Sequence, residues 1–169
     1  PYSVGTTVIS GPPGSGLLSM ADGTTLTATG AYSVANAYSL AGTLNFRGLN
    51  SFNLNGNTTL NPGATTFNVE APQATLTLGG ILTGADASSA LVKKGLGTLA
   101  LTNDNAFNGG VTLNAGVLQL SGLAGITPQP LAGGSIMVNA GLLALLNNGA
   151  ASNSQILYTA PIVSGTGAA

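Results

Sequence analysis

The chain has 169 residues, of which only 3 are Lys or Arg and 4 are Asp or Glu, and it contains no His, Cys or Trp. Its charged fraction of 4% lies far below the roughly 25% of an ordinary soluble domain. A net charge of -1 without a basic cluster argues against nucleic-acid binding. The absence of Cys and His excludes disulfide frameworks, structural zinc, haem ligation and thiol chemistry. A hydrophobic fraction of 44% is too high for a disordered tail.

Charge is distributed unevenly along the chain. From Asn105 to Ala169 there is no Asp, Glu, Lys or Arg. A neutral surface of Thr, Asn, Ser and Gly suits a protein that assembles or sits in an extracellular matrix, so we expect an exported structural protein. The most apolar stretch, residues 140–146, is far shorter than the roughly 20 residues of a membrane-spanning helix, and we expect no membrane span. Because the first residue is Pro1, we expect a processed chain or a segment of a longer one.

Short strands are predicted along most of the chain, because Gly, Asn, Thr and Ser interrupt every window long enough for a helix. Apolar residues two positions apart have the period of a strand that buries one face. They predict strands, in chain order, at residues 24–29, 43–46, 74–78, 98–102, 111–113, 117–120, 135–138 and 142–145. We expect one domain over residues 1–169, with an irregular start at 1–40 and repeat-bearing coils over 41–169.

A unit of strand, Asn-x-Gly and strand recurs in the sequence. It is found at Asn61-Pro62-Gly63, Asn114-Ala115-Gly116 and Asn139-Ala140-Gly141. The last two copies are 25 residues apart and the first two are 53 apart, about twice that distance. Periods of 20 to 50 residues are typical of solenoids and repeat arrays.

The Asn-x-Gly element predicts a sharp bend, because Asn and Gly accept positive φ. Successive coils would then stack about 4.8 Å apart, with Leu113 above Val138 inside the coil. Leu120 and Leu145 would stack in the same way, and aligned Asn side chains would form an amide ladder. The sequence therefore predicts an all-β fold, a parallel β-helix of roughly 25 residues per coil. Its predicted turn and ladder residues are Asn61, Gly63, Asn114, Gly116, Asn139 and Gly141. The alternative is an antiparallel, pilin-like β-sandwich.

Residues 91–122 resemble the passenger-associated β-strand repeat of bacterial autotransporter proteins, and weaker copies lie at 56–67 and 133–145. The family pattern has a Lys-x-Gly-x-Gly-Thr-Leu strand, an Asn-rich loop ending in aromatic-x-Gly-Gly, a strand, Asn-Ala-Gly and a final strand. The matching residues are Lys94, Gly95, Gly97, Thr98, Leu99, Leu101, Asn105, Phe107, Gly109, Gly110, Asn114, Ala115, Gly116, Leu118 and Leu120. The resemblance implies a right-handed β-helix, a secreted bacterial surface protein and a structural or export-assisting role.

Few titratable side chains are available for acid or base catalysis. The carboxylates are Asp22, Glu70, Asp86 and Asp104. A cluster of Asp86 and Asp104 with Lys93 and Lys94 would resemble the acid and base clusters of β-helix enzymes that cleave acidic polysaccharides. The plainer interpretation puts both lysines in a solvated turn. We therefore expect no catalytic residues and no enzyme.

Three further groups are candidate sites. Asn103-Asp104-Asn105 carries oxygens suited to calcium, but adjacent residues of one loop usually cap a turn, and we expect neither a metal nor another cofactor. Asn57-Thr58-Thr59 is a glycosylation sequon that we interpret as turn and strand. The tyrosines could contact carbohydrate or pack in the core or at an interface; they are Tyr2, Tyr32, Tyr38 and Tyr158.

The leading functional hypothesis is a secreted, adhesive or biofilm-matrix β-solenoid that forms a stalk or a self-assembling fibre. The strand-like segments 2–9, 155–158 and 161–163 are apolar and uncharged, without the polar caps of natural solenoids. They would join copies end to end, or connect to the rest of a longer passenger. The alternatives are a pilin-like subunit that donates residues 1–10 as a strand and, less favoured, a polysaccharide-active enzyme.

Overall fold

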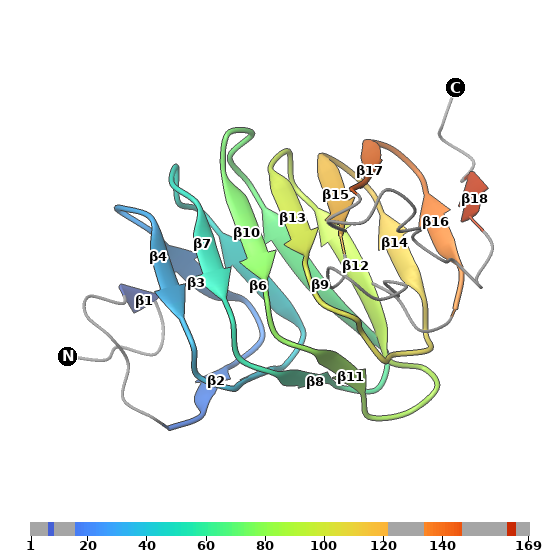
Figure 1. Ribbon diagram of the computed structural model, residues 1–169, viewed down its shortest axis with the longest axis horizontal. Coiled ribbons are helices and arrows are strands. Elements are labelled where there is room, and N and C mark those ends of the chain that lie inside the picture. The colour runs from blue at the N-terminus through green and yellow to red at the C-terminus, as the bar shows by residue number, and fades with distance from the viewer. Residues whose placement is uncertain (1–6, 9–15, 122–133, 147–161, 165–169) are drawn as a thin grey trace, which may run out of the picture.

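The computed structural model describes residues 7–8, 16–121, 134–146 and 162–164. The predictions made for most of residues 1–10, for Tyr2 and Tyr158, and for segment 155–158 lie outside these residues. All regular secondary structure in the described part is β-strand. Figure 1 shows the strands side by side along the longest axis of the molecule.

Within the described residues, three sheets make up the molecule, and we name them A, B and C. Sheet A contains β1 (Thr7–Val8), β3 (Thr24–Thr27), β6 (Thr43–Phe46), β9 (Ala64–Val69), β12 (Ala90–Lys94), β14 (Val111–Leu113), β16 (Ile136–Val138) and β18 (Ile162–Ser164). Sheet C contains β4 (Tyr32–Val34), β7 (Phe52–Leu54), β10 (Thr75–Leu78), β13 (Thr98–Leu101), β15 (Val117–Leu120) and β17 (Leu142–Leu145). Sheet B contains β2 (Leu18–Met20), β5 (Tyr38–Leu40), β8 (Thr58–Leu60) and β11 (Leu82–Gly84).

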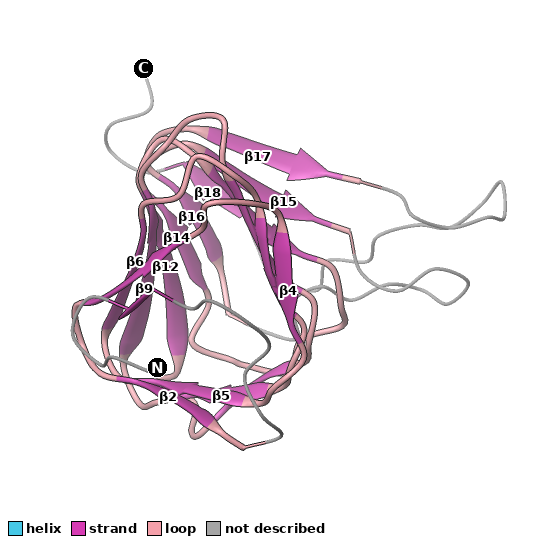
Figure 2. Ribbon diagram, turned by 90° about the vertical axis from the view of Figure 1, so that its left-hand side faces the viewer, coloured by secondary structure: helices cyan, strands magenta, loops and turns pink. Residues whose placement is uncertain are grey.

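The chain visits the sheets in the order A, C, B and then returns to A one rung further along, so that the sheets enclose a three-sided interior (Figure 2). The result is a β-solenoid of about five turns of roughly 23 residues. Every strand pair is parallel, as in β10 with β13 and β12 with β14. This pairing confirms the predicted parallel β-helix and excludes the antiparallel sandwich, whose neighbouring strands would run in opposite directions.

Coil length is less uniform than the sequence period of 25. Thr98 pairs with Val117, 19 residues on, whereas Ala64 pairs with Ala90, 26 residues on. The strands keep their register, as the pairing of Leu113 with Val138 and of Leu120 with Leu145 illustrates. The corners between strands absorb the differences in length.

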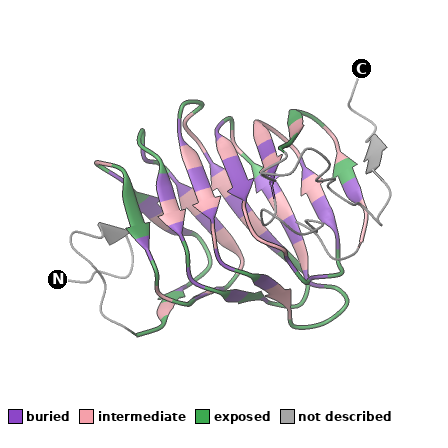
Figure 3. Ribbon diagram, viewed as in Figure 1, coloured by how far each residue is buried: buried purple, intermediate pink, exposed green. Residues whose placement is uncertain are grey.

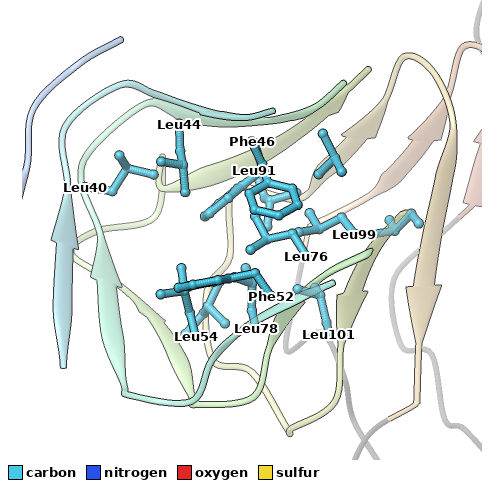
Figure 4. Close-up of a cluster of buried hydrophobic side chains, with 14 of the residues drawn as sticks. Leu40, Leu44, Phe46, Phe52, Leu54, Leu76, Leu78, Leu91, Leu99 and Leu101 are labelled. Atoms are coloured by element: carbon cyan, nitrogen blue, oxygen red, sulfur yellow. The ribbon is translucent and has the colours of Figure 1, made fainter. Parts of the chain in front are cut away.

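The core consists of apolar columns that run along the solenoid, because alternate residues of each strand point inward. One column on sheet C comprises Phe52, Leu76, Leu99 and Leu118, all at most 3% exposed. Figure 4 shows such side chains meeting in the interior, and Figure 3 shows the buried positions alternating along the strands. Each fully buried Leu contributes about 1.5–3 kcal/mol relative to an exposed one, so the columns provide the main attraction between coils.

Candidate functional site

The corner between sheets A and C changes character along the solenoid. In two early coils it spans five residues, 47–51 and 70–74. In the later coils it shrinks to three residues, at 95–97, 114–116 and 139–141. Two of these short corners are the Asn-Ala-Gly copies identified in the sequence, and we call all three the tight corners.

Two asparagines meet across successive tight corners. Asn139 Nδ2 donates a hydrogen bond to Asn114 Oδ1 at 2.7 Å, and the backbone N–H of Asn139 donates to Leu113 O. Gly116 has φ +69, and a Cβ there would lie 2.4 Å from the carbonyl oxygen of Gly95. Gly141 has φ +101 and lies similarly close to Gly116. A side chain at either glycine would therefore be strained and would push adjacent coils apart.

The third predicted copy lies elsewhere in the fold. Asn61 and Gly63 occupy the corner between sheets B and A, where Asn61 Nδ2 donates to Leu40 O at 3.1 Å. Gly63 has φ +84, but nothing would lie within 4 Å of an added Cβ. The offset of 53 residues is therefore not two coils. The same tripeptide bends the chain at two different corners, because both bends need a residue with positive φ.

Uncharged side chains also pair from coil to coil on all three outer faces. The pairs are Ser39 with Ser19 (3.3 Å) and Thr59 with Thr83 (3.0 Å) on sheet B, Asn53 with Ser33 (3.0 Å) on sheet C, and Asn68 with Asn45 (2.8 Å) on sheet A. These contacts satisfy polar groups without ionic partners. The only salt bridge among the described residues joins exposed Arg47 and Glu70 at 2.9 Å, a type worth less than about 1 kcal/mol.

Lys93 contradicts the prediction of a solvated turn. It lies on β12 facing inward, its residue is 0% exposed, and its strand neighbours are Phe67 and Leu113. Its Nζ donates to Lys94 O at 2.6 Å, to Gly95 O at 2.7 Å and to Ala115 O at 3.2 Å. Strand alternation explains the difference, since Lys93 shares the face of buried Leu91 whereas Lys94 points outward and is exposed.

Burial lowers the pKa of Lys93 to about 8, because the charged form loses its hydration inside the solenoid. The group therefore remains mostly protonated at neutral pH. Backbone carbonyl oxygens are its only hydrogen-bond partners in the described structure. Two of those oxygens belong to its own coil and the third to the next one, so the ammonium group joins two tight corners.

The carboxylates are dispersed. Asp22 Oδ1 accepts a hydrogen bond from the Thr43 N–H at 2.6 Å. Asp86 lies in the corner that precedes β12, where hydrogen bonds from the side chain and the N–H of Ser88 lower its pKa. Asp104 lies in the corner that follows β13, between sheets C and A. No group of three or more metal-binding side chains occurs in the part of the chain that the structure describes.

The side chains considered as calcium ligands, at residues 103–105, instead stabilise a turn through hydrogen bonds. Asn103 Nδ2 donates to Gly79 O at 3.2 Å, and Asn105 Oδ1 accepts from the Leu82 N–H at 2.9 Å. In the sequon, Asn57 Oδ1 accepts from the Ile81 N–H and the Thr58 hydroxyl donates to Tyr38 O, which fixes it as turn and strand.

Two tyrosines of the predicted set are described. Tyr32 is half exposed on β4, whereas Tyr38 is buried on β5. Burial raises the pKa of the Tyr38 phenol, and its hydroxyl has no hydrogen-bond partner. The two side chains therefore do not form a shared exposed aromatic surface.

Residues 91–120 of the chain match the family model of the passenger-associated-transport-repeat. The matched segment runs from β12 to β15 and includes the Lys93 corner and the Asn114 corner. No curated protein and no solved structure matches the chain. Across the described residues, no helix could span a membrane.

Sequence reasoning missed the role of Lys93. Counted back from Gly97 and Gly95, the spacing Lys-x-Gly-x-Gly begins at Lys93, not at Lys94 as we had assigned it. This spacing, together with the strand alternation that puts Lys93 on the same face as buried Leu91, is the sequence signal for a buried lysine. The repeat segment thus contains Lys93 beside one tight corner and Asn114 at the next, and Asn114 pairs with Asn139 of the following coil.

Proposed function

We propose that this chain is a secreted bacterial structural protein, a non-catalytic β-solenoid that serves at the cell surface as an adhesive stalk or as a subunit of an extracellular fibre. The observation that carries the proposal is the passenger-associated-transport-repeat at residues 91–120, set in a solenoid whose outer faces carry uncharged side-chain pairs between coils. Passenger repeats are associated with secreted or surface-exposed proteins.

Solenoid mechanics supports a spacer role. Each coil contacts only its neighbours, so the molecule lengthens in proportion to coil number. Polar pairs such as Asn45 with Asn68 face the solvent without contributing charge. Such a surface changes little with ionic strength, which suits a protein in an extracellular matrix.

Partners follow from the same geometry. Parallel sheets leave strand edges at both ends of a solenoid, and another copy or a further part of a longer passenger would extend them. A host surface or a carbohydrate is the ligand class that an adhesive stalk would contact. The polysaccharide-enzyme alternative has less support, because Asp86 and Asp104 occupy different corners and do not share an acid and base cluster with Lys93.

The proposal is tested on the cells that produce the protein and on the purified chain. An antibody against the chain should label intact, unpermeabilised cells, and protease added outside should remove that label. The purified chain should form elongated particles whose aligned samples diffract near 4.8 Å along the long axis. Labelling confined to permeabilised cells would refute the surface role, whatever the particle shape.

A further inference from the structure

Three backbone carbonyl oxygens converge on one buried point at the tight corner 95–97. The oxygens of Lys94, Gly95 and Ala115 lie 2.6, 2.7 and 3.2 Å from the Nζ of Lys93. The first two come from the coil of β12 and the third comes from the next coil. The inward turn of the chain at this corner uses Gly95, which has φ +76 and would place a Cβ 2.2 Å from Val69 O.

The chemistry of this point is that of a cation site. Carbonyl oxygens without a carboxylate are the ligands with which proteins replace the hydration shell of monovalent cations. Left without a donor, these three partly buried carbonyls would each lose hydrogen-bonding free energy on folding. The strand neighbours Phe67 and Leu113 supply no polar group.

No acidic side chain pairs with Lys93 in the part of the chain that the structure describes. Lys94, the next titratable residue on β12, points outward, and Glu70, at the corner after β9, is paired with Arg47. The backbone dipoles of two coils therefore hold the ammonium group by themselves, and the bond to Ala115 O makes the cation part of the contact between coils.

We propose that this corner is a primary-ammonium site, built from the backbone of two successive coils and occupied in this chain by its own Lys93. The Lys-x-Gly-x-Gly spacing is then the sequence form of the site: the lysine supplies the cation, and Gly95 lets the carbonyls turn inward. This assignment concerns how the coils are joined and does not depend on the proposed surface function.

Chemical rescue tests the assignment. Lys93→Ala removes the atoms that n-propylammonium would replace, whereas Lys94→Ala removes a neighbouring lysine that points outward. Each variant and the unsubstituted chain are refolded from urea at pH 7 in n-propylammonium chloride or in tetramethylammonium chloride at equal concentration. Thermal midpoints are measured by circular dichroism. Tetramethylammonium matches the charge but has no N–H group to donate.

We expect Lys93→Ala to have a lowered midpoint that n-propylammonium raises by several degrees, growing with the logarithm of its concentration. Tetramethylammonium should not raise it, and neither salt should selectively raise the midpoint of Lys94→Ala or of the unsubstituted chain. An equal response of Lys93→Ala to both salts would overturn the assignment.

Lys93→Met keeps the test decisive if the alanine variant does not fold. Methionine fills the volume without donating hydrogen bonds, so the assignment predicts a midpoint below that of the unsubstituted chain at pH 7. A Lys93→Met chain as stable as the unsubstituted one would show that the three carbonyls need no ammonium, and the proposal would be wrong.

Discussion

The early and late coils close the same three-sided interior by different means. From β2 to β11, four sheet B strands complete the turns, and the five-residue corners 47–51 and 70–74 join sheets A and C. From β12 onward that corner has three residues, and the described part of sheet B continues only as the bridge between Thr83 and Ala106. At this corner the late coils place positive-φ glycines against the backbone of the preceding coil, as at Gly95, Gly116 and Gly141.

This difference explains where the repeat is visible in the sequence. A three-residue corner accepts few residue types, because the chain must reverse within one positive-φ glycine and stack on the corner before it. A five-residue corner has many solutions and leaves no fixed pattern. The family model accordingly matches residues 91–120, within the late coils.

The largest expected effect compares Gly116, at a tight corner, with Gly63, at the three-residue corner between sheets B and A. Gly116→Ala and Gly63→Ala both place a side chain at positive φ, which costs about 1–2 kcal/mol. Only the Cβ at Gly116 would also collide with the backbone of the neighbouring coil. We expect Gly116→Ala to lose on the order of 4 kcal/mol, measured by urea unfolding. Equal losses would show that the tight corners are not in close contact.

A second prediction uses the pH dependence of the Lys93 corner. The folded pKa is about 8 and the unfolded value is 10.5, so between these values the unfolded chain holds a proton that the folded chain has lost. The free energy of unfolding should therefore rise with pH across this window, by up to about 3 kcal/mol. Urea titrations from pH 7 to 9.5, below the range in which Tyr38 ionises in the unfolded chain, should show this rise in the unsubstituted chain and in Lys94→Met. A rise that persists in Lys93→Met would assign it to another group.

The asparagine pair should have a smaller effect. Asn139→Ala and Asn114→Ala each remove the bond of 2.7 Å between the amides, and each should cost about 1 kcal/mol. In a double-mutant cycle the coupling should be about 0.5–1 kcal/mol. The pair Asn68 and Asn45 on the open face of sheet A is the matched comparison. Coupling no larger at the tight corner than on that face would weaken the contrast between the two regions.

The smallest effect is expected in the core of the early coils. The Tyr38 hydroxyl is buried without a hydrogen-bond partner, so Tyr38→Phe should raise the free energy of unfolding by about 1 kcal/mol. Tyr32→Phe, at a half-exposed position on β4, should be nearly neutral. A loss of stability in Tyr38→Phe would indicate that the phenol is hydrogen-bonded in solution.

Local sequence pattern predicted much of the fold and less of the site. Strands at 43–46, 111–113, 117–120 and 142–145 have the predicted bounds, because alternation and a flanking Gly or Asn define them. The strands β4 and β8, of three residues each, are not among the strand ranges predicted from the alternation of apolar residues. The repeat predicted Asn61 at the same corner as Asn114 and Asn139, but it lies at the corner between sheets B and A. The tripeptide specifies a bend and does not specify which sheets the bend joins.

Lys93 shows why chemistry was harder to predict than architecture. A lysine near the end of a strand usually remains solvated. Lys93 differs from such a lysine because it faces inward on β12 and lies two residues before Gly95. Its role depends on the carbonyl of Ala115, 22 residues away, which comes within reach only when the coils stack. The local Lys-x-Gly-x-Gly spacing marks the corner, but it does not specify which carbonyl of the next coil the stacking brings to the lysine.

The corner at residues 85–89 shows where the molecule can carry extra sequence. It is two residues longer than the corresponding corner 61–63 of the coil before, yet β9 and β12 remain paired over five residues. Asp86 and Ser88 hold the loop through their own hydrogen bonds at the solvent-exposed surface. A foreign peptide grafted there would project from the shaft while the frame on either side kept its alignment, which makes this loop the natural point for displaying an epitope or a label.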